Sequence, residues 1–129
     1  ATVWMASDPN CANQDFNITN GDFFRWSSLW PKFADYFGMK MGSVETVDLS
    51  AYMADKGVIW QRIVEKHGLF TQPLDQVGMW SYWRHLWTPD WDIISSMTKA
   101  RQFGFHDIVD SEAMFFRMFD HFRAERIFP

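Results

Sequence analysis

The 129-residue chain has a single cysteine, Cys11, so it cannot form an internal disulfide. It has no run of basic residues and a net charge of −4, which argues against nucleic acid as a partner. No stretch approaches the ~20 apolar residues of a membrane span, and the first residues lack the basic start and the apolar segment of a signal peptide. These absences predict a cytoplasmic protein that binds neither nucleic acid nor membrane.

Motifs that carry chemistry are also missing. The chain has no Gly-x-Gly-x-x-Gly or phosphate loop and no nucleophile elbow. Its four histidines have neither an i, i+4 pair nor a cysteine pair beside them, so the spacing of a metal site is absent. They are His67, His85, His106 and His121. We therefore expect no metal site and no bound nucleotide in this chain.

Tyr36 and Lys40 have the Tyr-x-x-x-Lys spacing of the catalytic pair in many short-chain dehydrogenases. On one helix this spacing would place both side chains on one face, where the ammonium could lower the pKa of the phenol. Gly38 lies between them, however, and is predicted to end the helix. We interpret the match as accidental and predict no catalytic residue in the chain.

Aromatic side chains are abundant, with 13 Phe, 8 Trp and 3 Tyr beside 8 Met. The length is enough for one domain, and a domain of this size has a limited interior. Some of these large groups are therefore expected to face a ligand, a partner domain or a second copy of the chain.

The stretch from residue 16 to 38 organises the rest. Residues 16–19 are typical of a short strand, and Asn20-Gly21-Asp22 predicts a turn and cap. A helix with an aromatic stripe follows, starting late or kinked because of Pro31 and ended by Gly38 in a left-handed conformation. The stripe has a period of 3.6 and consists of Trp26, Leu29, Trp30, Phe33, Tyr36 and Phe37.

Helical patterns dominate the remainder, so the predicted fold is mainly α with one or two short strands in a single domain, residues 1–129. Asp48 and Ser111 are expected to cap two of the helices, and Gly68 to end a third. Ile93, Ile94 and Met97 are expected to point inward from another. The predicted helices are 1–7, 48–54, 58–67, 74–87, 92–103 and about 111–126.

Several of these segments resemble the C-terminal part of the progesterone 5β-reductase and iridoid synthase family, an extended branch of the short-chain dehydrogenases/reductases. The resemblance runs over essentially the whole chain. The wider class to which this family belongs is similar to the NAD-dependent epimerases/dehydratases. The matching pieces are Phe16-Asn17, Asn20-Gly21-Asp22, Phe24, Trp26, Leu29-Trp30, Phe37-Gly38, Val77-Gly78, Ile94 to Ala100, Phe103-Gly104-Phe105 and Arg126 to Pro129.

The resemblance implies a parent enzyme with an α/β Rossmann domain that uses NADPH or NADH to reduce a carbon–carbon double bond next to a carbonyl. The nucleotide-binding domain and the catalytic residues of that parent would lie in an N-terminal part that is missing here. The chain would then be the C-terminal substrate-binding portion, inactive alone and without bound cofactor. Ala1 is accordingly expected to be a cut point, and Pro129 the natural C-terminus.

In that family the segment matching residues 76–83 lines the substrate pocket. The resemblance therefore implies substrate-binding roles for Met79, Trp80, Tyr82 and Trp83, with Tyr82 standing where the plant enzymes place a substrate-facing Phe. Flat side chains with few polar anchors suit a small apolar carbonyl compound, such as a steroid or terpenoid enone. Ser81 departs from the family pattern and leaves the substrate open. The alternative is that Trp80 and Trp83 are core residues.

A different class of function stays open. The chain could be a freestanding, aromatic-rich binding or interaction module without catalysis. If it is instead a separated portion of an enzyme, the face that packs on the missing domain would be bare. We then expect self-association, as a homodimer or by exchange of an element.

Overall fold

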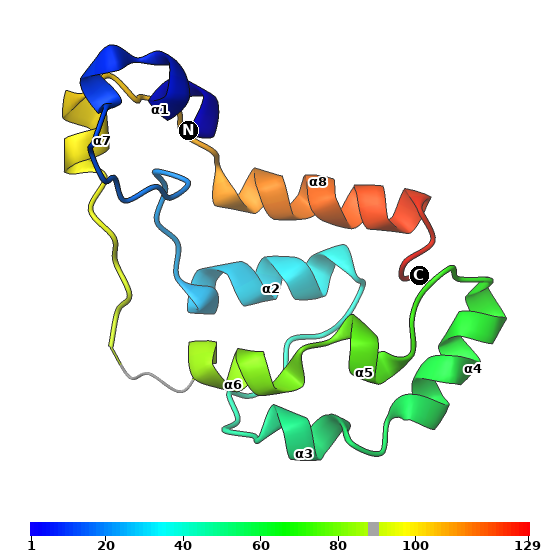
Figure 1. Ribbon diagram of the computed structural model, residues 1–129. Coiled ribbons are helices and arrows are strands. Elements are labelled where there is room, and N and C mark those ends of the chain that lie inside the picture. The colour runs from blue at the N-terminus through cyan, green and yellow to red at the C-terminus, as the bar shows by residue number, and fades with distance from the viewer. Residues whose placement is uncertain (88–90) are drawn as a thin grey trace. The chain divides into compact units, whose positions relative to one another are not determined.

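The computed structural model describes residues 1–87 and 91–129, without the side chains of residues 84–87, and within them the chain is helical and contains no strand (Figure 1). The predicted class, mainly α, is confirmed, whereas the predicted strand is wrong. The elements are α1 (Thr2–Ser7), η1 (Pro9–Cys11), α2 (Trp26–Tyr36), α3 (Leu49–Met53), α4 (Gly57–His67), α5 (Leu74–Val77), α6 (Trp80–Trp87), α7 (Thr98–Gln102) and α8 (Ser111–Ala124).

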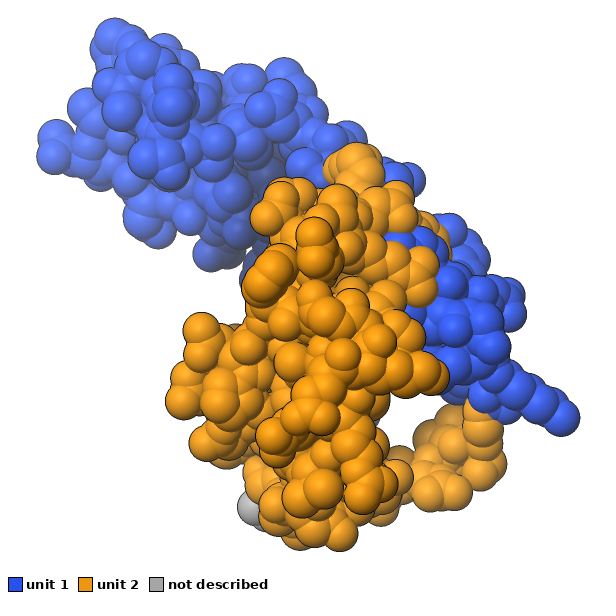
Figure 2. Space-filling model, turned by 90° about the vertical axis from the view of Figure 1, so that its right-hand side faces the viewer, with its two compact units in different colours: residues 1–41, 93–115 blue, residues 42–92, 116–129 orange. Residues whose placement is uncertain are grey.

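Two compact units divide the chain, and the backbone passes between them three times. Unit 1 consists of residues 1–41 and 93–115, and unit 2 of residues 42–92 and 116–129 (Figure 2). The sequence predicts one domain and gives no linker to mark such a division. Each unit is described below by itself.

Residues 16–19 of unit 1 form no strand because side chains, and not a neighbouring strand, hold them. The ring of Phe16 packs against Trp4 and Phe103, with centroid distances of 5.0 and 5.2 Å. The backbone N–H of Thr19 donates to the sulfur of Met97 at 3.3 Å. A strand requires a ladder of backbone hydrogen bonds, and here this segment contributes to a buried apolar cluster instead. That cluster consists of Met97, Ala100 and Phe105, with Trp4 and Phe16 packed against it.

The Asn20-Gly21-Asp22 turn forms as predicted, with Gly21 at φ 74°. It binds the start of α8: the N–H of Ser111 donates to Oδ2 of Asp22 at 2.9 Å, and the Asn20 amide donates to the Ser111 hydroxyl at 3.3 Å. Ser111 is therefore the first helical residue and not the cap. Oδ1 of Asp110 caps the helix instead by accepting from the N–H of Ala113 at 2.7 Å.

α2 begins at Trp26, the late start that Pro31 predicts, and buries Leu29 and Phe33. Phe33 meets Phe115 edge to face with 5.2 Å between ring centroids. Gly38 adopts φ 64°, and the N–H groups of Gly38 and Met39 donate to the carbonyls of Asp35 and Ala34. This is the predicted left-handed helix end, in its Schellman form.

In unit 2, Asp48 caps α3 as predicted: its carboxylate accepts from the N–H groups of Ser50 and Ala51 at 3.0 and 3.3 Å. Gly68 ends α4 at φ 60°. After α4, the N–H of Phe70 donates to the carbonyl of Arg126 at 2.8 Å, which joins this loop to the C-terminal residues.

Two predicted helices are wrong in part. The helix expected over 74–87 is two short helices, because the backbone is extended at Gly78 (φ −114°, ψ 121°) and α6 starts afresh at Trp80. The helix expected over 92–103 is reduced to α7. Ile93 and Ile94 lie in the non-helical segment before it and are exposed, whereas Met97 is buried.

Candidate functional site

Unit 2 contains a cleft of about 560 Å³, within the usual range of small-molecule sites. Its walls come from α3, α4, the loop that follows α4, and the starts of α5 and α6, which in Figure 1 form the green part of the ribbon. The lining residues are Ser50, Met53, Ala54, Gly57, Trp60, Gln61, Val64, Thr71, Gln72, Pro73, Leu74, Asp75 and Trp80.

Trp60 provides one wall of the cleft from the middle of α4. Its indole Nε1–H donates to the backbone carbonyl of Gln72 at 3.0 Å. This bond satisfies the polar atom of the ring and fixes the loop of residues 71–75 against α4. Val64 follows Trp60 by four residues, one turn further on, and extends the same apolar wall. Nothing in the sequence pattern indicates that Trp60 lines a cleft.

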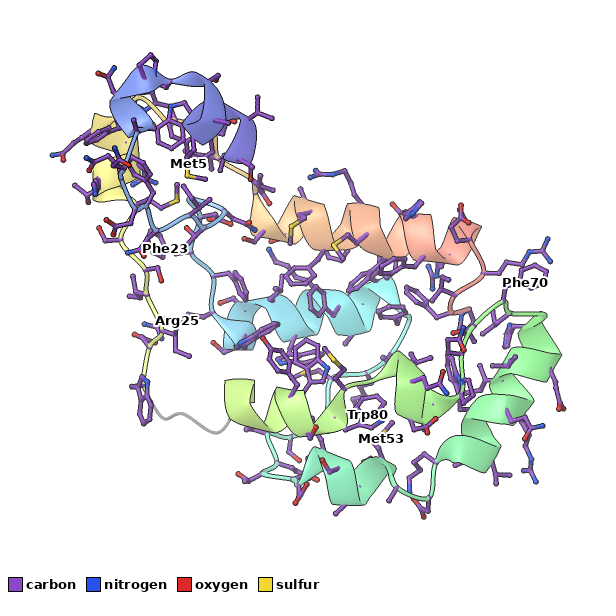
Figure 3. The ribbon with its side chains drawn as sticks, in the orientation of Figure 1. Met5, Phe23, Arg25, Met53, Phe70 and Trp80 are labelled. Carbon is purple, nitrogen blue, oxygen red and sulfur yellow. The ribbon has the colours of Figure 1, made fainter. Side chains whose placement is uncertain are left out.

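Trp80, the first residue of α6, provides another wall and is half-buried. Met53 at the end of α3 lines the same cleft, and Figure 3 labels both side chains. Thioether and indole groups present a polarisable, adaptable surface to an apolar ligand. These side chains make the cleft suitable for a flat apolar molecule.

The polar groups on the cleft are few and dispersed. They are the hydroxyls of Ser50 and Thr71, the amides of Gln61 and Gln72, and the carboxylate of Asp75. Among the described lining residues none is Lys, Arg or His, so a carboxylate or phosphate ligand would find no cationic partner. The arrangement suits a neutral ligand with one or two oxygens that accept or donate hydrogen bonds.

Of the four residues predicted to bind substrate, Trp80 lies on this cleft. Met79 and Tyr82 are outside its lining, with 65% and 51% of their surface exposed. Trp83 is half-buried, and its ring lies 6.3 Å from that of Tyr82. Roles for Met79, Tyr82 and Trp83 therefore stay predictions, and a cleft within this unit does not require them.

Tyr36 and Lys40 do not share a helix, because α2 ends at Tyr36 and Gly38 turns the chain. His85 lies among the residues whose side chains are not described. In the described part of the chain no three His, Cys, Asp or Glu side chains converge as metal ligands. None of the described helices is long and apolar enough to cross a membrane.

Comparison with known proteins places the chain in a family. Residues 5–129 match the PRISE-like Rossmann-fold domain. The chain is 35% identical over 137 residues to an (S)-8-oxocitronellyl enol synthase of Nepeta cataria and 34% over 131 residues to that of Catharanthus roseus, covering 98% of this chain in both cases. It is 30% identical over 144 residues to the short chain dehydrogenase gsfE of Penicillium aethiopicum, covering 99% of this chain.

These matches define the class: an oxidoreductase family of the short-chain dehydrogenase/reductase kind. The chain belongs to the PRISE-like Rossmann-fold family, and the resemblance found in the sequence is confirmed. The chain spans about a third of the length of these relatives, 33% and 34% of the two plant synthases and 38% of the fungal dehydrogenase.

Proposed function

We propose that this chain is the C-terminal substrate-binding part of an NAD(P)H-dependent oxidoreductase that reduces enone-type substrates of the steroid or terpenoid kind. The cleft lined by Trp60 and Trp80 would hold the apolar body of the substrate. The nucleotide and the groups that stabilise the developing enolate would come from the remainder of a longer protein. The chain alone would bind substrate without converting it.

The observation that carries this proposal is the presence of an apolar, cation-free cleft in a chain that corresponds to about a third of its relatives. An enone has a flat conjugated system and a carbonyl oxygen that accepts hydrogen bonds. The hydroxyls of Ser50 and Thr71 and the amides of Gln61 and Gln72 are the side-chain donors on the cleft wall that such an oxygen can meet. The Gln61 amide is already oriented, since its Nε2 donates to Glu65 at 3.2 Å.

Binding is tested by isothermal titration calorimetry with progesterone as a steroid enone and citral as a terpenoid enone. We expect saturable binding of at least one compound. Trp80→Ala and Trp60→Ala should each weaken it by about tenfold, because a buried tryptophan contact commonly contributes more than ~1 kcal/mol. Trp91→Ala is the matched control, since Trp91 is 69% exposed and lies outside the cleft.

Absence of saturable binding of both compounds, or equal affinity in the Trp80→Ala and Trp91→Ala variants, would reject the proposed site. Binding of apolar compounds without any preference for a conjugated carbonyl over its saturated analogue would favour a freestanding binding module instead.

Catalysis is tested separately by following NADPH absorbance with each enone. The chain alone is expected to show no oxidation above the rate without protein, because its sequence has no Gly-x-Gly-x-x-Gly or phosphate loop and Tyr36 and Lys40 do not share a helix. A rate proportional to protein concentration would show that the chain is itself an enzyme and would overturn this part of the proposal.

A further inference from the structure

We propose that Gly78 is a positioning residue for the cleft: its missing side chain provides the space in which the Trp80 indole lies. The role of this pair in ligand choice rests on the proposed function of the cleft. The geometry of the pair does not, and it is measured independently below.

The indole of Trp80 folds back over the backbone of Gly78. A Cβ atom added to Gly78 would lie 2.2 Å from Cζ2, 2.4 Å from Cε2 and 2.5 Å from Cη2 of the Trp80 ring. Carbon atoms make favourable contact at about 3.5–4.0 Å. Any side chain at position 78 would therefore displace the ring by more than about 1 Å from its present place.

Backbone conformation does not explain this glycine. Gly78 has φ −114° and ψ 121°, a region open to every residue. Its N–H donates to the carbonyl of Leu74 at 3.2 Å, a bond that most residues could make as well. The requirement for glycine at this position therefore comes from the close approach of the ring.

Among the seven glycines, all within the described residues, Gly78 alone has a side-chain contact this close. At Gly21 the nearest atom would be 3.3 Å from the added Cβ, and at Gly42 no atom lies within 4 Å. Gly42 also lacks a positive φ, so Gly42→Ala is a matched control without strain or collision.

Displacement of the ring changes the cleft. Trp80 is the first residue of α6, where a side chain can turn without breaking the hydrogen bonds of the following turn. The ring lines the cleft, so its movement changes the space that a flat ligand occupies. Gly78 thus sets the width of the site through Trp80 and acts on specificity without contact with the ligand.

The first test reads the ring itself. In a spectrum of ¹⁵N-labelled protein the indole N–H signal of Trp80 is identified by its loss in Trp80→Phe. Gly78→Ala is expected to move this signal, whereas Gly42→Ala leaves it in place. An unmoved Trp80 signal in a folded Gly78→Ala protein would overturn the proposal whether or not the cleft binds enones.

The second test reads affinity for progesterone or citral in a double-mutant cycle. Gly78→Ala alone should weaken binding by about fivefold to tenfold, a typical coupling for residues in contact. In the Trp80→Ala background the same change should alter affinity by less than about twofold, because no ring remains to be displaced. An equal loss in both backgrounds would contradict the positioning role. If the wild-type chain binds neither compound, the proposed function fails while the indole signal still decides the role of Gly78.

If Gly78→Ala folds poorly, the melting temperature tests the proposal instead. If the only cost of a side chain at position 78 is its clash with the Trp80 ring, Gly78→Ala/Trp80→Ala melts at the same temperature as Trp80→Ala. A further fall in melting temperature in the double variant would show that Gly78 serves the backbone, and would reject the proposal.

Discussion

At the scale of single residues, Asp22 has the clearest electrostatic signature. The N–H and hydroxyl of Ser111, followed by the N–H of Phe23, hold the pKa of the Asp22 carboxyl below its usual value, although partial burial acts in the opposite direction. One carboxylate thus orders its own turn and the start of α8, which lies 89 residues further along the chain.

A lowered pKa has a definite sign for stability. The charged carboxylate stabilises the fold above its unfolded-state pKa of about 3.9, and this contribution is lost as pH falls through the lower folded value. Asp22→Asn is therefore expected to lower the melting temperature at pH 7, with a difference from wild type that closes below about pH 3.9. Circular dichroism melts at pH 7, 5 and 3 measure this, with Asp107→Asn, an exposed residue before α8, as control. A deficit that persists unchanged at pH 3 would contradict the assignment.

At the scale of elements, Gly38 at the end of α2 is a position where the free-energy cost of a left-handed backbone conformation can be measured without a steric clash. A Cβ at Gly38 would meet no atom within 4 Å, so only its φ of 64° opposes substitution. Gly38→Ala should lower the free energy of unfolding by about 1 kcal/mol. Gly42→Ala, without a positive φ, should change it by less than about 0.5 kcal/mol. Urea titration measures both, and equal effects would show that the helix end tolerates an ordinary residue.

Elements whose causes are local could be predicted from the sequence. Asp48 caps α3 through N–H groups two and three residues away, and Gly38 ends α2 through carbonyls three to five residues back. In both cases the capping residue and the backbone groups that it bonds lie within about one turn of helix of each other, so the sequence alone shows them. The resemblance to the family was likewise readable, because its motifs are long and rich in tryptophan.

The errors arose where distant contacts decide the backbone. The break at Gly78 is an exception, because the Trp80 ring that lies against Gly78 is only two residues away, and the continuous apolar pattern over residues 74–87 does not indicate it. The sequence predicts Met97 on a helix, whereas in the structure it precedes α7, and Thr19, 78 residues earlier in the chain, donates to its sulfur from both N–H and hydroxyl. The cleft cannot be predicted from the sequence because Trp60 and Trp80, which line it, come from different helices.

At the scale of the whole molecule, self-association stays a prediction, and unit 1 offers a surface for it. Phe23 and Ile94 line one small hollow of about 190 Å³ and are 71% and 66% exposed. Ile108, 65% exposed, approaches Gly21 on the rim of the same hollow. Phe23 is labelled in Figure 3. Large apolar groups gathered in this way usually meet a partner.

Sedimentation velocity over a range of concentrations is expected to show reversible dimers. Phe23→Ser combined with Ile94→Ser should weaken dimerisation by about tenfold or more, since each change removes a large apolar contact. Val44→Ser is the control, because Val44 is 95% exposed and lies in the other unit. A monomer at every concentration would contradict the prediction, as would equal association of the variant and control.

The hydrogen bond between Asp22 and Ser111 closes a long loop of the chain that includes every residue lining the cleft. The entropic cost of closing a loop grows only logarithmically with the number of residues in it, so that doubling the loop length costs about 0.6 kcal/mol. Insertions and deletions between the two anchor points are therefore thermodynamically cheap. We therefore expect the loops between Asp22 and Ser111, which include those that line the cleft, to tolerate changes of length while this hydrogen bond is kept.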